Sequence, residues 1–306
     1  MANIRGRYIS LTSSSERRIR LEQHLQKLGL SQHYSCFHAI RGDEQAATTR
    51  GLRAGEWGLW QSWLQLLQKE LNQPGPGYDW LHIVEDDVEL SRHFVVFCQK
   101  LKPGLPSFDL LFTDMYVNPS IYRALSEEHQ RLQDKGELHF KTDAYTGCTA
   151  SVLIHRERIA EVLNCLQNCI ESGKPTLPLD NQLRRMFHQK SLRFARTAPF
   201  ITGVTLNSIR NSTIQESERA HQSVTLTQQI CMNLRRQLST LNHTQATEEL
   251  VNLIQHLART DKCEGRKDAT RSITLSLIDL AEKYDLLRYN VQTRLLGEPN
   301  NPQQFL

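Results

Sequence analysis

Apolar and polar positions follow two different periods along the first two-thirds of the chain, one typical of strands and one typical of helices. Strand-like runs lie at 7–11, 34–40, 80–87, 109–117 and 145–154, with short ones near 192–204. Helix-like stretches lie between them, at 16–29, 55–71, 91–101 and 156–171, and a further helix opens at 175-PTLPLD-180. Strands that alternate with helices predict an α/β fold with a mostly parallel sheet, covered by helices on both faces.

The pattern changes after about Gln215. Between Gln215 and Leu296 the chain has no proline and one glycine, Gly265, and apolar residues recur at helical spacing. This segment predicts three helices, broken near 242–245 and 260–268. We therefore expect an α/β domain over 1–214, a helical extension over 215–296 and a disordered tail over 297–306.

Composition narrows the class of protein. The 306 residues carry a net charge of +4, which is too weak to indicate nucleic acid and suits anionic small molecules or an anionic membrane surface. No window approaches the ~18 apolar residues of a membrane span, and the first residues carry charge where a signal peptide needs an apolar stretch. Seven cysteines without C-x-x-C spacing predict reduced thiols in a cytoplasmic protein.

The segment 80-WLHIVEDDVEL-90 places three carboxylates, Glu85, Asp86 and Asp87, directly behind an apolar strand. Ligand sites of open parallel sheets form outside the carboxyl ends of the strands. Mg²⁺ and Mn²⁺ prefer carboxylate and phosphate oxygens, so a divalent cation here would bridge the strand end to a diphosphate. The alternative is that the acids cap a following helix, where negative charge is favoured.

Four segments, in order across residues 7–214, resemble glycosyltransferase family 25, the lipooligosaccharide β-galactosyltransferase family that includes collagen galactosyltransferases. They are 8-YISLTSSSERRIRLEQHLQKLGL-30, 52-LRAGEWGLWQSWLQLL-67, 83-IVEDDVEL-90 and 178-PLDNQLRR-185 followed by 199-PFITGVTLNSIRNSTI-214. The matches to the family motifs are Arg17 and Arg18, Gly55, Glu56, Gly58 and Ser62, the Glu-Asp-Asp motif and Asp180. The chain departs from the family at Ser10, Leu59, Trp63 and Leu67, which makes it a divergent member.

The resemblance implies a single nucleotide-sugar-binding domain of the GT-A type and a metal-dependent, inverting transferase. It would move a hexose, usually galactose, from a UDP-sugar to a saccharide of a cell-surface glycan such as lipooligosaccharide, with Mn²⁺ or Mg²⁺ as cofactor. The expected metal ligands are Asp87 and Asp86, and the catalytic residues are Asp180, as base, and Asp87. The expected nucleotide-sugar residues are Leu11, Arg17, Arg18, Glu56, Ser62, Glu85 and Asp86.

Several of these residues also have plain structural interpretations. Asp180 could cap the helix that follows Pro178, and Glu56 could sit in the first turn of its helix, where acids are favoured. Arg17 and Arg18 could line a solvated helix face. All three interpretations stay open at this point.

Residues outside the family motifs also have predicted places in the fold. Asp114 ends the strand 109-DLLFTD-114 and could line the acceptor side of the site. Trp60 and Trp63 share a helix face, which favours a place in the core over a sugar platform. His82, inside its strand, is interpreted as structural.

Two alternatives to the leading function remain. The same chemistry could act on a protein or peptide side chain, or the chain could be a degenerate, non-catalytic member that binds a nucleotide sugar or a partner. The helices after Gln215 could form a homodimer, cover the acceptor groove or hold the enzyme peripherally on the cytoplasmic face of the inner membrane. Packing on the main domain or on a second copy is the plainer expectation, because basic groups there are sparse.

Overall fold

The computed structural model describes residues 3–72, 77–171, 176–205 and 231–241. The described helices are α1 (Ser15–Lys27), α2 (Glu44–Thr49), α3 (Ala54–Asn72), α4 (Arg92–Lys100), α5 (Pro119–Asp134), α6 (Ile159–Glu171) and α7 (Leu179–Gln189), with 3₁₀ turns η1 (Ser31–His33) and η2 (Arg156–Arg158). The described strands are β1 (Ile4–Ser10), β2 (Tyr34–His38), β3 (Trp80–Glu85), β4 (Val88–Leu90), β5 (Leu110–Phe112), β6 (His139–Lys141), β7 (Ser151–His155), β8 (Phe194–Ala198) and β9 (Thr202–Val204).

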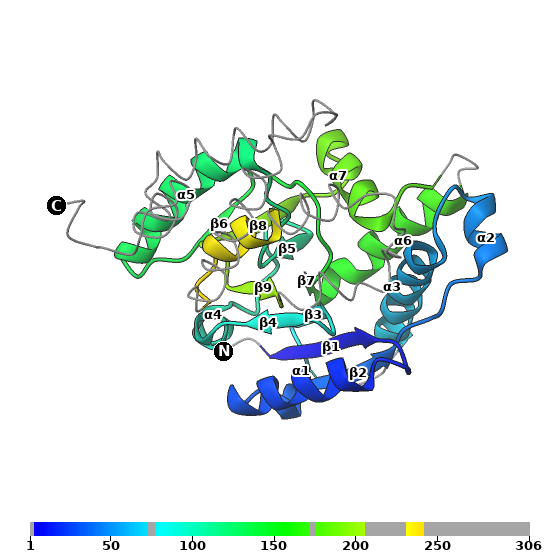
Figure 1. Cartoon of the computed structure of the whole chain (residues 1–306), viewed down its shortest axis with the longest axis horizontal. Helices are drawn as coiled ribbons and strands as arrows, with labels where there is room; N and C mark the ends of the chain where they lie inside the picture. Colours follow the sequence, from blue (N-terminus) through cyan, green and yellow to red (C-terminus); the bar gives the residue numbers. More distant parts are fainter. Residues whose placement is uncertain (1–2, 73–76, 172–175, 206–230, 242–306) are drawn as a thin grey trace, which may run out of the picture.

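Seven of these strands form one sheet in the order β2-β1-β3-β7-β5-β8-β6 (Figure 1). The pairs β1–β2, β1–β3 and β5–β8 are parallel, whereas β7 pairs antiparallel with β3 and β5, and β6 antiparallel with β8. β2, β1, β3, β5 and β8 therefore run one way, and β7 and β6 run the other. The predicted α/β class with a mostly parallel sheet is confirmed.

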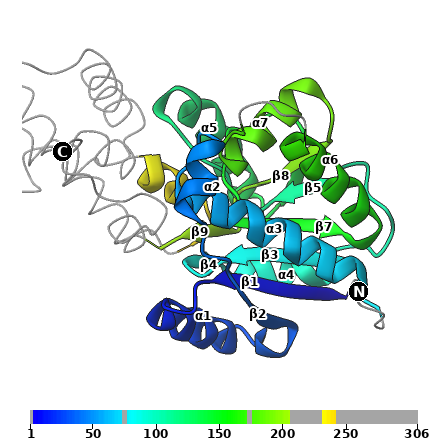
Figure 2. The same ribbon diagram turned by 90° about the vertical axis from the view of Figure 1, so that its right-hand side faces the viewer.

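Helices cover both faces of the sheet, as the sequence pattern predicts (Figure 2). Alternate residues of β3 point to opposite faces: Leu81 and Ile83 join the core under α3, α6 and α7, while Trp80 and Val84 join the core under α1 and α4. Both cores consist of fully buried apolar side chains. The sheet is thus held rigidly between two helical layers, which fixes the positions of the strand ends.

The structure adds elements that the sequence pattern did not predict. The stretch after residue 117, expected to be polar and without an element, contains α5 and β6. Asn118 caps α5 by accepting a hydrogen bond from the backbone N–H of Ile121 at 3.2 Å, and a proline opens the helix. A short helix, α2, follows Asp43, which accepts from the N–H of Ala46 at 2.8 Å.

The described part of the predicted helical extension is residues 231–241, of which 231–237 are helical. This segment lies against the sheet domain beside β9 (yellow in Figures 1 and 2), and Phe200 and Ser239 form a parallel bridge. The rest of 215–296 and the tail 297–306 lie outside the described residues, so the predicted domain boundaries stay predictions. Among the helices that the structure describes, none has the length and apolar character to cross a membrane.

Candidate functional site

β1, β3, β5 and β8 all end at the same edge of the sheet, called here the carboxyl edge. Their last residues are Ser10, Glu85, Phe112 and Ala198. The antiparallel strand β7 begins at this edge, at Ser151. Side chains that follow four strands and precede a fifth are therefore brought together here, as expected of a ligand site in an open sheet.

Glu85, Asp86 and Asp87, called here the acidic turn, lie at the carboxyl edge and lead from β3 into β4. β4 pairs antiparallel with β9, and the next helix, α4, begins only at Arg92 with Ser91 at its N-cap position. The alternative that these acids cap a helix is therefore wrong. Their position needs another physical explanation, because three adjacent carboxylates repel one another.

Asp86 and Asp87 are held by groups from β1 and α1. The hydroxyl of Ser10 donates to Oδ2 of Asp86 at 2.7 Å, and Nη1 of Arg17 donates to Oδ1 of Asp86 at 3.1 Å. The same guanidinium nitrogen lies 3.7 Å from Oδ2 of Asp87. Arg17 thus compensates part of the charge of the acidic turn, and the alternative of a solvated helix face is wrong for it.

Glu85 is half-buried and accepts a hydrogen bond from Oγ1 of Thr149 at 2.9 Å. Burial raises the pKa of Glu85, and the nearby charges of Asp87 and Asp86 raise it further, against the lowering effects of Thr149 and Arg235. The carboxyl group of Glu85 therefore keeps a proton to a higher pH than an exposed glutamate does. This protonation relieves part of the repulsion within the acidic turn.

Asp114, two residues beyond the end of β5, is buried, with 1% of its surface exposed. Its Oδ2 accepts from Nε of Arg235 at 2.7 Å and also from Nη2 of the same guanidinium. Burial raises the pKa of Asp114, and the charge and hydrogen bonds of Arg235 oppose that rise. The sequence placed Asp114 at the carboxyl edge through its strand but gave no indication of its partner.

Arg235 comes from the segment 231–241 and is 2% exposed. Burial lowers the pKa of Arg235, but the charge and hydrogen bond of Asp114 and the charge of Asp87 outweigh this effect, and the net shift is upward. Arg235 is thus a buried, permanently charged cation among the acids of the carboxyl edge. The sequence did not predict this position, because the pair 235-RR-236 belongs to the sparse basic groups of a segment that was expected to be an ordinary helix.

Asp180 lies in the first turn of α7 and accepts a hydrogen bond at Oδ1 from the N–H of Asn181 at 2.8 Å. A Cβ built on Gly147 would lie 3.6 Å from Oδ2 of Asp180, so this carboxylate faces the loop that also supplies Thr149. Gly147 has φ +127°, a conformation that suits glycine. Asp180 and the acidic turn therefore both lie against the same loop.

The remaining predicted residues have structural partners. Arg18 donates to the backbone oxygens of Leu11 at 2.6 Å and of Thr12 at 3.1 Å, and so fixes the loop after β1. Glu56 accepts from the N–H of Arg53 at 2.8 Å in the first turn of α3. Ser62 is fully buried and bonds backbone groups of Gly58 and Ile40. None of these bonds involves the acidic turn.

Trp60 and Trp63 are fully buried in the core, as predicted. His82 is structural, also as predicted: it is buried, it bonds the hydroxyls of Tyr34 at 2.6 Å and Ser151 at 2.8 Å, and it stacks on Phe94. The described cysteines are free thiols without a disulfide.

The acidic turn can hold a cation only if substrate phosphates and water complete the coordination. Among the described residues no three histidine, cysteine or acidic side chains are arranged as a metal site. Mg²⁺ in particular is commonly held by one or two carboxylates together with substrate phosphates and water. Asp87 and Asp86 can supply those carboxylates, although both oxygens of Asp86 already accept hydrogen bonds.

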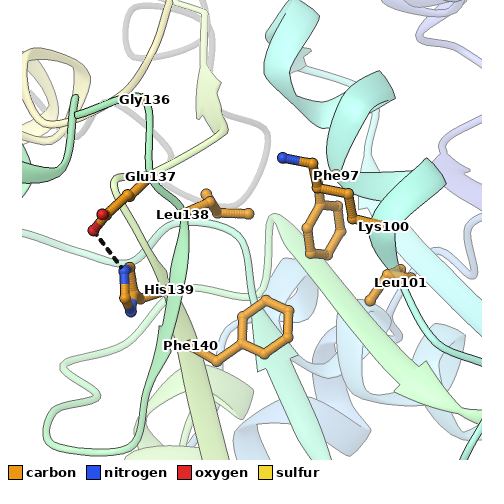
Figure 3. A pocket seen from close by; sticks show the side chains of 8 residues that line it. All are labelled: Phe97, Lys100, Leu101, Gly136, Glu137, Leu138, His139 and Phe140. Carbon is orange, nitrogen blue, oxygen red and sulfur yellow. Dashed lines mark hydrogen bonds and ion pairs between the residues drawn. The ribbon is translucent and has the colours of Figure 1, made fainter. Parts of the chain in front are cut away.

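A hollow in the described part of the chain lies away from the acidic turn. It has a volume of about 400 Å³ and is formed by the end of α4 and the segment 136–140, with Phe97 and Phe140 facing one another and a Glu137–His139 contact at its rim (Figure 3). Leu101 lines it, and the adjacent Lys102 accepts a hydrogen bond from Trp80, the first residue of β3. The hollow therefore lies beside β6, an edge strand of the sheet, and none of its lining residues belongs to the acidic turn.

The sequence matches no protein-family model and no curated protein. Similar solved structures include a glycosyltransferase involved in glycosylation of the major capsid of PBCV-1, with 8% identity and a TM-score of 0.38 over 63% of this chain and 81% of the other. They also include a Drosophila β-1,4-galactosyltransferase 7 variant in complex with manganese, UDP-Gal and xylobiose, with 9% identity and a TM-score of 0.37 over 73% and 79%.

A third similar structure is a mannosyltransferase from Pyrobaculum calidifontis in complex with GDP-Man and Mn²⁺, with 11% identity and a TM-score of 0.29 over 96% of this chain and 85% of the other. All three are described as glycosyltransferases. Because the TM-scores and identities are low, these likenesses assign neither a family nor an activity, and the resemblance to family 25 stays a prediction. Functional assignment therefore depends on the residues of the site.

Proposed function

We propose that this protein is a metal-dependent glycosyltransferase that moves a hexose, most readily galactose, from a UDP-sugar to a saccharide acceptor of a cell-surface glycan. One observation carries the proposal. The acidic turn sits at the carboxyl edge, caps no helix, and is held in place by Ser10 and Arg17. Ser10 and Arg17 hold adjacent carboxylates together at the edge where ligands of such sheets bind, and this arrangement suits the binding of a cation and a diphosphate.

The roles of the residues follow from their positions. Asp87, with Asp86 beside it, would hold a divalent cation, which supplies neutralisation of the charge that builds on the departing diphosphate. Arg17, already within 3.1 Å of Asp86 and 3.7 Å of Asp87, keeps these carboxylates oriented toward the edge. Glu85, through its bond to Thr149, positions the loop 145–149 against the turn.

Asp180 is the proposed base. A half-buried carboxylate with one oxygen held by the N–H of Asn181 keeps the other oxygen, Oδ2, directed at the loop containing Gly147. From there Oδ2 can accept the proton of an acceptor hydroxyl as that hydroxyl attacks the anomeric carbon. Attack from the face opposite the departing UDP would invert the configuration.

The test is UDP release by the purified full-length protein from a panel of UDP-sugars, with Mn²⁺ and with EDTA. We expect slow release from one sugar, dependent on metal, and a loss of at least ~100-fold in Asp87→Asn, because removal of a major charge-stabilising group costs rates of that order. Asp134→Asn, a neutralised carboxylate at the exposed end of α5, is the matched control and should release UDP at the wild-type rate.

The other outcomes separate the alternatives. Metal-dependent binding of UDP without release from any sugar or acceptor would favour a non-catalytic nucleotide-sugar-binding protein. Transfer to peptides but not to saccharides would move the acceptor class to proteins. Absence of both UDP binding and release, with and without metal, contradicts the proposal.

A further inference from the structure

Arg235 occupies a place at the carboxyl edge that neither the family resemblance nor the roles above account for. It lies outside the segments that carry the resemblance, yet its guanidinium is buried against Asp114. The charge of Asp87 raises the pKa of Arg235, and the charge of Arg235 in turn lowers the pKa of Glu85. Arg17, the other cation of the acidic turn, is already bonded to Asp86. Arg235 is therefore the cation whose function is left to explain.

The backbone around Arg235 is fixed to the sheet domain on both sides. The N–H of Phe200 donates to the carbonyl of Leu238 at 3.2 Å, and the N–H of Thr240 donates back to Phe200 at 2.8 Å. Arg236 donates from Nη1 to Glu89 at 3.0 Å and to the carbonyl of Val204 at 2.9 Å. The guanidinium of Arg235 is thus placed by anchored neighbours, which is the arrangement that a binding group needs.

The pair formed by Arg235 and Asp114 leaves bonding capacity on both partners. Nε and Nη2 of Arg235 both donate to one oxygen of Asp114, Oδ2, while Nη1 contacts only the sulfur of Met232, at 3.7 Å, among the described residues. The other oxygen, Oδ1 of Asp114, is buried and has no hydrogen-bond partner in the described part of the chain. Buried polar atoms usually have partners, so the unpartnered Oδ1 of Asp114 and the Nη1 of Arg235, which contacts only a sulfur, are both able to bind a ligand.

The chemistry of that ligand follows from the two open groups. Guanidinium N–H groups match phosphate oxygens, and a buried carboxylate oxygen accepts from a hydroxyl. A molecule that carries phosphate and hydroxyl groups close together, next to a cation-binding acidic turn, is a nucleoside diphosphate sugar. A bare carbohydrate supplies no anion for Arg235.

We infer that Arg235 binds the diphosphate of the sugar donor and that Asp114 both orients Arg235 and accepts a hydrogen bond from a donor hydroxyl. This inference rests on the proposed function and extends it. The segment 231–241 then belongs to the donor site, to which it contributes Arg235. Arg235 stabilises negative charge on the diphosphate in addition to the cation held by the acidic turn.

The experiment measures binding of UDP and UMP by calorimetry to the full-length protein, in the presence of Mn²⁺. Arg235→Gln should weaken UDP binding at least tenfold and UMP binding less than threefold, because UMP lacks the second phosphate. Arg235→Lys should recover part of the loss. Arg131→Gln, at an exposed arginine in the last turn of α5, is the matched control and should stay within threefold of wild type for both nucleotides.

A second variant guards against misfolding, since Arg235→Gln leaves Asp114 buried without its partner. Asp114→Asn combined with Arg235→Gln removes both charges, and its melting temperature shows whether it folds. This double variant should show the same selective loss of UDP affinity. Equal UDP affinity in wild type and in the folded double variant, or an equal loss of UDP affinity in Arg131→Gln, would overturn the inference and leave the proposed function standing.

Failure of the proposed function gives a different result. If wild-type protein binds no nucleoside diphosphate with or without Mn²⁺, both proposals fail. If Asp87→Asn abolishes the metal dependence of UDP binding while Arg235→Gln has no effect on it, the proposed metal site holds and only the role of Arg235 is wrong.

Discussion

At the scale of single residues, Ser10 shows how the end of β1 holds the acidic turn. Its hydroxyl donates to the buried Asp86 carboxylate at 2.7 Å. A hydrogen bond to a charged group contributes about 1.5–3 kcal/mol. Ser10→Ala should therefore lower the free energy of unfolding by about 2 kcal/mol, measured by urea denaturation.

The control for this prediction is Ser13→Ala, an exposed serine in the loop that follows β1. Surface substitutions usually stay within about 0.5 kcal/mol. The amide introduced by Ser10→Asn can donate to Asp86, so this variant should retain more stability than Ser10→Ala. Equal unfolding free energies for Ser10→Ala and Ser13→Ala would contradict the assigned role.

His82 makes stability depend on pH. Burial lowers the pKa of His82 to about 3, whereas a histidine in the unfolded chain titrates near ~6.5. Between these two pH values the unfolded chain binds a proton at His82 and the folded chain does not, which favours the unfolded state. The free energy of unfolding is therefore unaffected by His82 above pH ~6.5 and declines as the pH falls toward 3. The slope is about 1.4 kcal/mol per pH unit.

The measurement is the difference in unfolding free energy between wild type and His82→Gln, which keeps hydrogen-bonding groups but does not titrate. We expect this difference to narrow by about 2–3 kcal/mol between pH ~6.5 and ~4.5. Other titrating groups are common to both proteins and cancel in the difference. A difference that does not change with pH would show that folded His82 titrates normally.

At the scale of elements, the start of α3 is locked to the loop after β2 by two glycines. A Cβ on Gly58 would lie 2.5 Å from the carbonyl oxygen of Ile40 and 2.8 Å from the backbone nitrogen of Gly42. Glycine-to-alanine changes within a helix normally stabilise by up to ~1 kcal/mol. Here the sign should reverse, and Gly58→Ala should lose at least about 2 kcal/mol in denaturant unfolding, because two backbone segments would have to separate.

Gly104 provides the matched control, since a Cβ built there meets nothing within 4 Å and its φ is not positive. Gly104→Ala should change the unfolding free energy by less than about 0.5 kcal/mol. A neutral or stabilising Gly58→Ala would mean that α3 shifts freely against the loop. The tight approach would then contribute nothing to placing Glu56 and Ser62.

Elements with strong periodicity could be predicted from the sequence, and short or context-dependent ones could not. The run 80-WLHIVE-85 is a buried strand by composition alone, and it became β3. β4 has three residues and forms by pairing with the distant strand β9, so no local sequence pattern predicts it. The sequence pattern did not predict α5, although Asn118 and Pro119 signal its start, because most of the segment between 117 and 145 is polar.

At the scale of the whole molecule, the candidate site depends on contacts between distant parts of the chain. Strand ends could be predicted to meet at one edge, and the acidic turn and Asp180 lie there beside one loop. The pairing of Asp114 with Arg235 could not be predicted, since no local pattern links β5 to the segment 231–241. Non-local charge pairs are set by packing of the complete chain.

Because the site is assembled from β1, β3, β5, α7 and the segment 231–241, a donor nucleotide should stabilise the whole folded chain. A ligand at 100 times its dissociation constant adds about 2.7 kcal/mol to the free energy of unfolding. For a domain of this size that corresponds to a rise of about 5 °C in Tm. UDP with Mn²⁺ should produce this rise in a thermal scan, and EDTA should remove most of it, since the acidic turn repels an uncompensated diphosphate.

GDP and Asp87→Asn make the thermal scan specific. A uridine-selective site gives a smaller rise with GDP than with UDP at equal concentration, whereas equal rises would assign recognition to the diphosphate and metal alone and remove the support for a UDP-sugar donor. Asp87→Asn should lose the metal-dependent part of the rise, because one of the two carboxylates available to the cation is gone. A UDP-dependent rise that survives both EDTA and Asp87→Asn would show that the acidic turn takes no part in binding the nucleotide, and the arginines of the carboxyl edge would then be the groups that hold it.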